Sequence, residues 1–209
     1  MKTASLFSAL IFLLTVSLTA APVLKPYAEA VVSKAHPATA EASAVLRVSA
    51  RGTHAHKTYL VFDANSLKPQ ELESASGAEL SLTTLEDYYL LGSPGGPVSL
   101  SLYLVESNAK NPALLNLSWS NAPANDTASE ARLLATVLVD SASVKGDQAV
   151  QWDDPRILTA LREISAQSGA KYLTLLVVSD GTVSDPGFNF YSSQNTSRSS
   201  REPRLLIRE

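Results

Sequence analysis

The sequence predicts an antiparallel β-sandwich of jelly-roll type with one short crossover helix. Short apolar segments with alternating side chains recur between residues 42 and 207, which is typical of a sandwich. Turn-forming residues separate these segments, and residues 92–97 are a run of Gly, Ser and Pro that requires a turn. With 209 residues and 45% hydrophobic content, the chain can bury the core of one domain without disulfides or metals.

The predicted strands differ in how many of their faces are apolar. In 80–83 and 100–105 every second residue is leucine, and a period of two places one face of a strand against a core. Segment 58–63 has apolar residues on both faces, which suits a central strand. The other predicted strands are 45–49, 114–119, 134–139, 149–152, 172–178, 188–191 and 204–207.

The predicted helix covers residues 155–168. Asp154 can accept hydrogen bonds from the free N–H groups of a first turn, and Pro155 has no N–H to leave unpaired there. Gly169 can adopt the left-handed conformation that ends a helix. One apolar stripe follows from the helical spacing of Ile157, Leu158, Leu161 and Ile164. We expect this helix to lie across one end of the sandwich.

The N-terminal 20 residues predict a secretory signal peptide. Lys2 precedes an apolar run over 6–18, and small residues follow up to Ala20, after which we predict cleavage. An uncleaved membrane anchor is the alternative, but the run is shorter than the ~20 apolar residues that a spanning helix needs. Residues 21–41 have little periodicity, so we expect a linker or a loosely held N-terminal arm. The folded domain is then 42–209.

The chain has no cysteine and a formal net charge of −3. An exported protein without disulfides depends on core packing alone, which favours a bacterial source over a eukaryotic one. Removal of residues 1–20 takes away Lys2 and no acidic residue, which leaves a charge of −4. A mildly acidic chain without basic blocks argues against nucleic acid as a partner. We therefore expect a secreted, extracellular protein with no stable membrane insertion after cleavage.

Three segments in a fixed order resemble the DNRLRE domain, also called carbohydrate-binding module family 96. They are 58–63 (TYLVFD), 116–123 (NLSWSNAP) and 188–193 (FNFYSS), and 201–207 (REPRLLI) follows them. Members of that family typically carry YLRFDLS, ITWNNAP and FYSRE stretches, then Pro and a last strand. The resemblance covers 42–207 and implies an exported β-sandwich that binds polysaccharides, in some members alginate-like acidic ones. The chain departs from the family at Ser193-Gln194, where the family has Arg-Glu.

Sugar binding needs flat aromatic faces and planar hydrogen-bonding groups at their rim. The rings that we predict to contact sugar are Tyr88, Tyr89 and Trp152, with Tyr191 also eligible, although one residue of the pair Tyr88-Tyr89 is expected to face the core. The resemblance instead places Trp119 inside the sandwich, and we expect Phe62 to be buried there too.

Positive charge gathers at one predicted strand-turn-strand corner. We call the set Arg47, Arg51, His54, His56 and Lys57 the basic corner. A polyuronate carries carboxylates that would pair with it, and guanidinium groups bind carboxylates through two parallel hydrogen bonds. The alternative is that these residues only solvate the tip of a hairpin.

The sequence contains fewer patterns that indicate a catalytic or metal site than patterns that indicate sugar binding. Glycoside hydrolysis needs two carboxylates about 5–10 Å apart, yet Asp63 ends a predicted strand and Asp154 is a predicted helix cap. His54 and His56 could grip zinc, but no third ligand lies at a recognisable spacing. The sequence marks no cofactor with certainty. Structural calcium stays open, since loop carboxylates can hold it, here Asp126, Asp140, Asp180 or Asp185.

The sequence as a whole predicts an exported, non-catalytic protein that recognises a polysaccharide, with an acidic glycan favoured by the basic corner. The alternative is a structural cell-surface or matrix protein that uses the sandwich for protein contacts. An open hydrophobic edge strand or a flat apolar patch would favour that alternative. An uncharacterised lyase or hydrolase ranks third.

Overall fold

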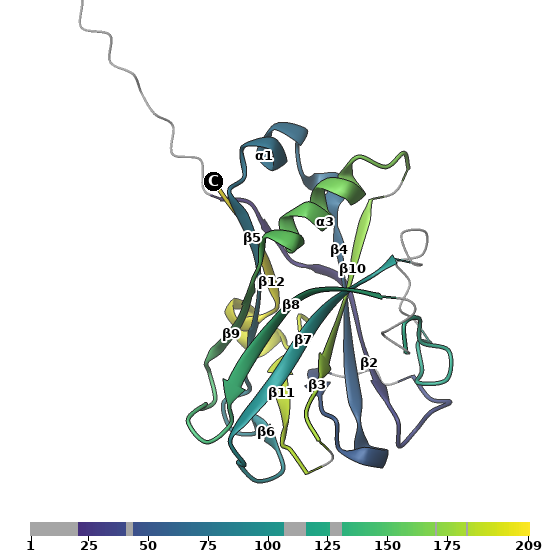
Figure 1. The fold of residues 1–209 in the computed structure, drawn as a ribbon, viewed down its shortest axis with the longest axis vertical. Helices are drawn as coiled ribbons and strands as arrows, with labels where there is room; N and C mark the ends of the chain where they lie inside the picture. The colour runs from purple at the N-terminus through teal and green to yellow at the C-terminus, as the bar shows by residue number, and fades with distance from the viewer. Residues whose placement is uncertain (1–20, 41–43, 107–115, 126–130, 170, 183) are drawn as a thin grey trace, which may run out of the picture.

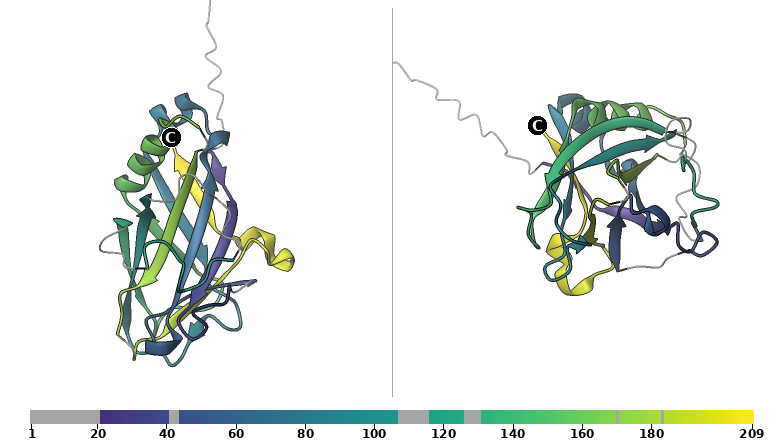
Figure 2. Two further views of the ribbon diagram at one scale, coloured as in Figure 1. Left: turned by 90° about the vertical axis from the view of Figure 1, so that its right-hand side faces the viewer. Right: turned by 60° about the horizontal axis from the view of Figure 1, so that its bottom comes forward.

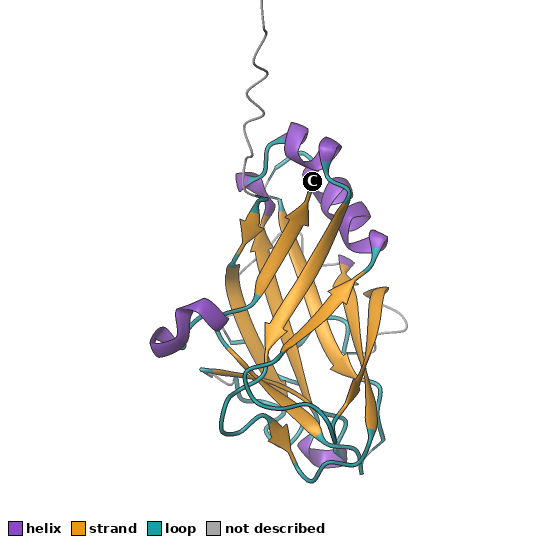
Figure 3. Ribbon diagram, turned by 90° about the vertical axis from the view of Figure 1, so that its left-hand side faces the viewer, coloured by secondary structure: helices purple, strands orange, loops and turns teal. Residues whose placement is uncertain are grey.

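The computed structural model describes residues 21–40, 44–106, 116–125, 131–169, 171–182 and 184–209. They form an elongated sandwich of antiparallel strands, with two helices at the end that also holds the C-terminus and loops at the other end (Figure 1). Strands dominate the molecule, and the helices are short (Figure 3). The predicted all-β fold is confirmed.

Three sheets build the sandwich, and the strand pairs of the described chain are antiparallel. The five-stranded sheet has the order β2 (Pro26–Ser33), β4 (His56–Asp63), β10 (Tyr172–Ser179), β7 (Pro97–Val105) and β8 (Ala131–Asp140). The four-stranded sheet has the order β1 (Val23–Leu24), β12 (Arg204–Arg208), β5 (Gly77–Thr83) and β9 (Ala149–Asp153). The three-stranded sheet has the order β3 (Val45–Val48), β11 (Gly187–Tyr191) and β6 (Leu90–Leu91).

The core follows the alternation of the strands. In β4, Leu60 and Phe62 are fully buried in the main apolar cluster, whereas Tyr59 and Val61 belong to a second cluster on the other face of the strand. We call the face with the second cluster the outer face of the five-stranded sheet. Burial on both faces agrees with the prediction of a central strand here. The burial of Phe62 is also confirmed.

Two α-helices close one end of the sandwich (Figures 1 and 2). α3 (Pro155–Ser165) begins where predicted, since the Asp154 carboxylate accepts a hydrogen bond from the N–H of Arg156 at 2.9 Å, but it ends three residues early. Gly169 has the expected left-handed φ of 105°. The sequence did not predict α1 (Pro69–Ser74), which contacts α3. The connections contain 3₁₀ turns η1 (Gly52–His54), η2 (Ala64–Ser66) and η4 (Thr196–Arg201).

Residues 23–33 are part of the fold, which corrects the prediction of a linker or loose arm over 21–41 for this stretch. β1 pairs with β12, and β2 pairs with β4 over most of its length. The period of two in β2 rests partly on Ala28 and Ala30, whose small side chains give a weak apolar signal. The predicted signal peptide, 1–20, lies outside the described residues. Within the described ranges, none of the helices has the length and apolar composition to cross a bilayer.

The described part of the predicted strand 114–119 is a turn. Asn116 has a φ of 71°, and the Asn121 side chain accepts hydrogen bonds from the N–H of Ser118 at 2.7 Å and from its hydroxyl at 3.1 Å. Such local bonds compete with a strand ladder. Trp119 is half-buried on the outer face of the five-stranded sheet, so the prediction of a core Trp119 is wrong.

Candidate functional site

The basic corner lies at the loop end of the sandwich, where η1 joins β3 to β4 (Figure 1). The Nη1 of Arg51, just before η1, donates a hydrogen bond to the carbonyl of Leu91 at 2.8 Å, which ties the guanidinium to β6. Gly92 has a φ of 101°, and a Cβ built there would lie 1.8 Å from that Nη1. Glycine is therefore needed at 92 both for the turn and for the place of Arg51.

Arg47 lies on the face of the three-stranded sheet that points away from the core. Both its neighbours in sequence are buried in the core, and its Cα partner across the ladder is Asn189 of β11. The Nδ2 of Asn189 donates to the carbonyl of Tyr88 at 2.7 Å, and its N–H donates to the carbonyl of Tyr89 at 2.8 Å. These bonds hold the loop with Tyr88 against β11. The side chain of Tyr88 is 61% exposed.

Asn189 has no exposed surface, and its Oδ1 makes no hydrogen bond to the described residues. A buried acceptor without a donor costs free energy. The hydrogen bonds that Asn189 donates to the Tyr88 and Tyr89 carbonyls are therefore what its amide contributes at this position. Those bonds position Tyr88. Tyr89 is partly buried and packs against the main core, as expected for one residue of the pair.

The other members of the basic corner lie in η1 and β4 rather than in the three-stranded sheet. Lys57 lies on the outer face of the five-stranded sheet, where its Nζ donates to the carbonyl of Asn125 at 2.6 Å and lies 5.1 Å from the Trp119 ring centroid. The Nδ1 of His56 is 3.2 Å from the hydroxyl of Ser49, while His54 is exposed in η1. The structure thus divides the predicted corner between two sheets.

Trp152 is not available to a sugar, which corrects its assignment as a binding residue. Its side chain is 1% exposed in the main core, and its Nε1 donates to the carbonyl of Leu100 at 3.0 Å. The burial pattern of β9 alternates, with Val150 and Trp152 inward and Gln151 outward. That alternation in sequence was the signal that could have placed Trp152 in the core.

The candidate metal ligands do not come together. Among the described residues, no three His, Cys, Asp or Glu side chains form a group that could hold a metal ion. Three of the calcium candidates accept hydrogen bonds from other residues instead: Asp140 accepts from the N–H of Ala142, Asp180 from the hydroxyl of Ser101, and Asp185 from the N–H of Thr182. The fourth, Asp126, lies outside the described residues.

Two carboxylates that the sequence analysis did not single out, one half-buried and one buried, lie near the junction of β11 and η4. Glu29 of β2 accepts hydrogen bonds from the hydroxyl of Ser192 at 2.6 Å and from the N–H of Ser193 at 3.0 Å. Burial raises the pKa of Glu29 above its ordinary value, and the bonds from Ser192 and Ser193 oppose that rise. Glu202, which is 8% exposed, pairs with Lys25 at 2.5 Å.

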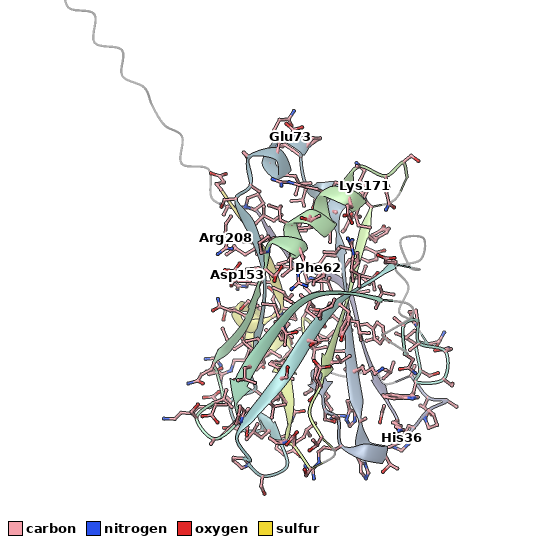
Figure 4. The ribbon with its side chains drawn as sticks, in the orientation of Figure 1. His36, Phe62, Glu73, Asp153, Lys171 and Arg208 are labelled. Atoms are coloured by element: carbon pink, nitrogen blue, oxygen red, sulfur yellow. The ribbon has the colours of Figure 1, made fainter. Side chains whose placement is uncertain are left out.

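The arginines of the C-terminal segment hold this segment to the body. Arg198 pairs with Glu86 at 2.6 Å, and the Nη1 of Arg201 donates to the hydroxyl of Tyr191 at 3.3 Å. Tyr191 is thereby enclosed and offers no free ring to a sugar. Figure 4 shows Arg208 beside Asp153, to which its Nη1 donates at 2.8 Å.

The sequence analysis also missed a pair of aromatic residues, of which Tyr27 is exposed and Tyr172 is half-buried. Tyr27 of β2 and Tyr172 of β10 have ring centroids 5.3 Å apart. Tyr27 fell in the segment expected to be a linker, and Tyr172 fell in an apolar strand that was assigned to the core. Their pairing depends on the order β2-β4-β10, which one sequence does not reveal.

Comparison with protein-family models and with curated proteins finds no match for this chain.

Proposed function

We propose that this protein is an exported, non-catalytic carbohydrate-binding protein that binds an acidic polysaccharide. Its binding surface is the outward side of the three-stranded sheet with Arg47, Arg51 and Tyr88, which we call the β3–β11–β6 face. The signal-peptide pattern of residues 1–20 supports export. The resemblance of 58–63 and 188–193 to the DNRLRE domain supports polysaccharide as the ligand. Because one fold hosts many functions, the ligand depends on the residues of this surface rather than on the fold.

The observation that carries the proposal is that hydrogen bonds tie Arg51 to β6 and the Tyr88 loop to β11, the two strands that share a sheet with Arg47 of β3. Arg51 uses Nη1 for the Leu91 carbonyl, and its other donors make no hydrogen bond to the described residues. A guanidinium with free planar donors suits the carboxylate of a uronic acid. The buried Asn189 amide fixes the loop of Tyr88, so an exposed ring is ready to stack on a sugar. Such pre-organisation reduces the entropy that binding would cost.

Binding should be weak and sensitive to salt. A shallow surface buries little of each sugar, so we expect a Kd of roughly micromolar to millimolar. The affinity should fall as salt rises, because the Debye length shrinks from about 10 Å at 0.1 M to about 3 Å at 1 M. Arg51→Ala should weaken binding to alginate or pectin about tenfold, which is about 1.4 kcal/mol. Electrophoresis in gels that contain alginate, pectin or neutral glucans measures both effects.

Arg204→Ala is the matched control, since Arg204 is exposed and its Nη2 donates only to the nearby carbonyl of Ser200 at 2.7 Å. This variant should migrate like the wild type in every gel. Absence of retardation in acidic and neutral gels, with calcium both present and chelated, would refute carbohydrate binding. Equal retardation of the wild type and Arg51→Ala in alginate would place the site elsewhere.

One observation favours the alternative of a structural protein that assembles through its sheets. β8 is ten residues long, ends the order of the five-stranded sheet, and exposes 69% of Leu138. A long apolar edge strand is a template for pairing with another chain. Two features of the same strand oppose assembly: a register shift opposite Leu102/Tyr103, and Arg132, which pairs with Glu163.

Under this alternative, the wild type elutes as an oligomer and Leu138→Lys elutes as a monomer, because a charge on an edge strand blocks strand pairing. Size-exclusion chromatography with light scattering at rising concentration measures the mass directly. Thr136→Lys is not a suitable control, since Thr136 bonds to Ser101 at 2.9 Å. Gln70→Lys on α1 is a better one, because its side chain is exposed on a helix rather than on a sheet edge. A wild type that stays monomeric throughout would contradict assembly through β8.

A further inference from the structure

A second surface of the molecule carries two tyrosines with neighbouring rings. Tyr27 and Tyr172 lie where β2 and β10 begin, at the helical end of the five-stranded sheet. Their ring centroids are 5.3 Å apart and their planes are inclined by 43°. Lys171, labelled in Figure 4, marks this end, and His36 marks the opposite end of the same sheet. The basic corner at the loop end is thus far from this pair along the strands.

A β-bulge directs Tyr27 outward. Pro26 lies opposite Phe62 and Ala28 lies opposite Val61, so Tyr27 is an extra residue without a partner on β4. A bulge re-aims the side chain of the extra residue, and here Tyr27 is 58% exposed. An exposed aromatic ring contributes little of the burial free energy that such rings supply in a core. Within the monomer, Tyr27 contacts the Tyr172 ring and still leaves more than half of its surface open to a ligand.

A carboxylate lies beside the tyrosine pair. Asp63 ends β4 directly opposite Tyr172. Its Oδ1 accepts hydrogen bonds from the N–H and the Nδ2 of Asn65, at 2.8 and 2.6 Å, whereas its Oδ2 makes none to the described residues. Desolvation, and then the nearby Tyr27 hydroxyl and Asp63 carboxylate, raise the pKa of Tyr172. The phenol groups and a carboxylate oxygen thus lie together at one patch.

We infer that Tyr27, Tyr172 and Asp63 form a binding site for a neutral, hydroxyl-rich polysaccharide. The exposed ring of Tyr27 can stack on the apolar face of a pyranose, as aromatic rings do with flat apolar groups. The free carboxylate oxygen can accept a hydrogen bond from a sugar hydroxyl, and hydrogen bonds to charged groups are among the stronger ones. The same negative charge disfavours a uronate carboxylate at this site.

This inference rests on the proposed carbohydrate binding, but it concerns a different surface and a different glycan. The β3–β11–β6 face has arginines and suits acidic chains, whereas the tyrosine pair has a carboxylate and suits neutral ones. One protein would then hold an acidic and a neutral glycan at opposite ends. The two sites can be separated by ligand, by salt dependence and by mutation.

The test is affinity electrophoresis of the full exported chain in gels with a neutral glucan, xylan or mannan, and in parallel with alginate. We expect retardation by at least one neutral glycan that stays unchanged between 0.1 and 1 M salt, because no ion pair contributes. Tyr27→Ala should reduce this affinity about tenfold, and Tyr27→Phe should retain most of it because the ring remains. Val23→Ala, which alters another exposed apolar side chain, should bind like the wild type.

Each outcome of this test either supports or overturns the tyrosine site. Retardation by alginate without retardation by any neutral glycan overturns the tyrosine site but leaves the proposed function intact. Equal neutral-glycan binding by Tyr27→Ala and the wild type, with matching melting temperatures, also overturns it. A change in molecular mass of Tyr27→Ala by light scattering, without a change in glycan binding, would instead assign the pair to a protein contact. Loss of binding in Tyr27→Ala alone supports the site.

Discussion

Replacing Trp152 with alanine should lower the free energy of unfolding by about 3–5 kcal/mol, the usual cost of removing a large aromatic side chain from a core. Trp152 is 1% exposed and among the largest fully buried side chains of the described chain. The variant loses apolar contacts, leaves a cavity, and loses the hydrogen bond from the indole to the Leu100 carbonyl. Urea denaturation followed by circular dichroism gives the value, with the slope compared to confirm two-state unfolding.

Trp119→Ala is the matched control, because it removes the same side chain from a half-buried position. Its ring contacts the outer face of the five-stranded sheet and lies under Lys57, so we expect a smaller loss of about 1–2 kcal/mol. A larger loss for Trp119→Ala than for Trp152→Ala would contradict the roles that the structure gives to the two tryptophans.

The burial of the two tryptophans was predictable from local sequence pattern, although the family resemblance favoured the opposite assignment. Each follows an alternating segment, and the family resemblance favoured Trp119 as the core residue. The period of two in β9, with Val150 and Trp152 on one side, was the physical signal for the opposite assignment. Around Trp119, the Asn121 side chain accepts from the N–H of Ser118 and donates to the carbonyl of Asn116, and these local bonds end the strand pattern. Short polar residues next to an apolar run therefore indicated a turn.

Strands with strong apolar patterns were predicted correctly, because a strand that is buried between two sheets needs apolar residues, and these are visible in the sequence. β4, β7 and β10 are examples, and each is central in the five-stranded sheet. β2 was missed because it is an edge strand with small residues, and tertiary pairing with β4 rather than local preference makes it a strand.

The candidate sites were harder to predict than the fold. Arg47 and Asn189 face each other only because β3 pairs with β11, and Tyr27 meets Tyr172 only because β4 lies between β2 and β10. Such neighbours are distant in sequence, and charge or aromatic character alone does not reveal the pairing. The sequence analysis therefore grouped Lys57 with Arg47 and Arg51. In the structure, Lys57 lies on the outer face of the five-stranded sheet, whereas Arg51 is bonded to β6 of the three-stranded sheet.

The stability of the protein should depend on pH through Glu29, and Glu29→Gln should reveal this dependence. The pKa of Glu29 is raised in the folded protein, chiefly by burial, above its ordinary value of 4.5. Below pH 4.5 the group is protonated in the folded and unfolded states, and its favourable contribution is complete. That contribution is lost as the pH rises through the folded-state pKa, because the ionised form is costly to bury.

Glutamine does not titrate, and its side chain can still accept from the N–H of Ser193 and donate to the hydroxyl of Ser192. Glu29→Gln should therefore gain stability relative to the wild type as the pH rises from 4 to 7. Paired urea unfolding curves at several pH values measure the difference. A constant difference across this range would mean that Glu29 has the same pKa in both states.

Glu163→Gln supplies a control of opposite sign. A hydrogen bond and ion pair from Arg132 lower the pKa of Glu163, so its contribution is present above pH 4.5 and is lost as the pH falls through the folded-state pKa. Glu163→Gln should thus be less stable than the wild type at pH 7, and the difference should shrink toward low pH. The effect should be small, because both side chains are more than a third exposed. Opposite trends for the two variants would show that burial causes the pH dependence at Glu29 and that the ion pair with Arg132 causes it at Glu163.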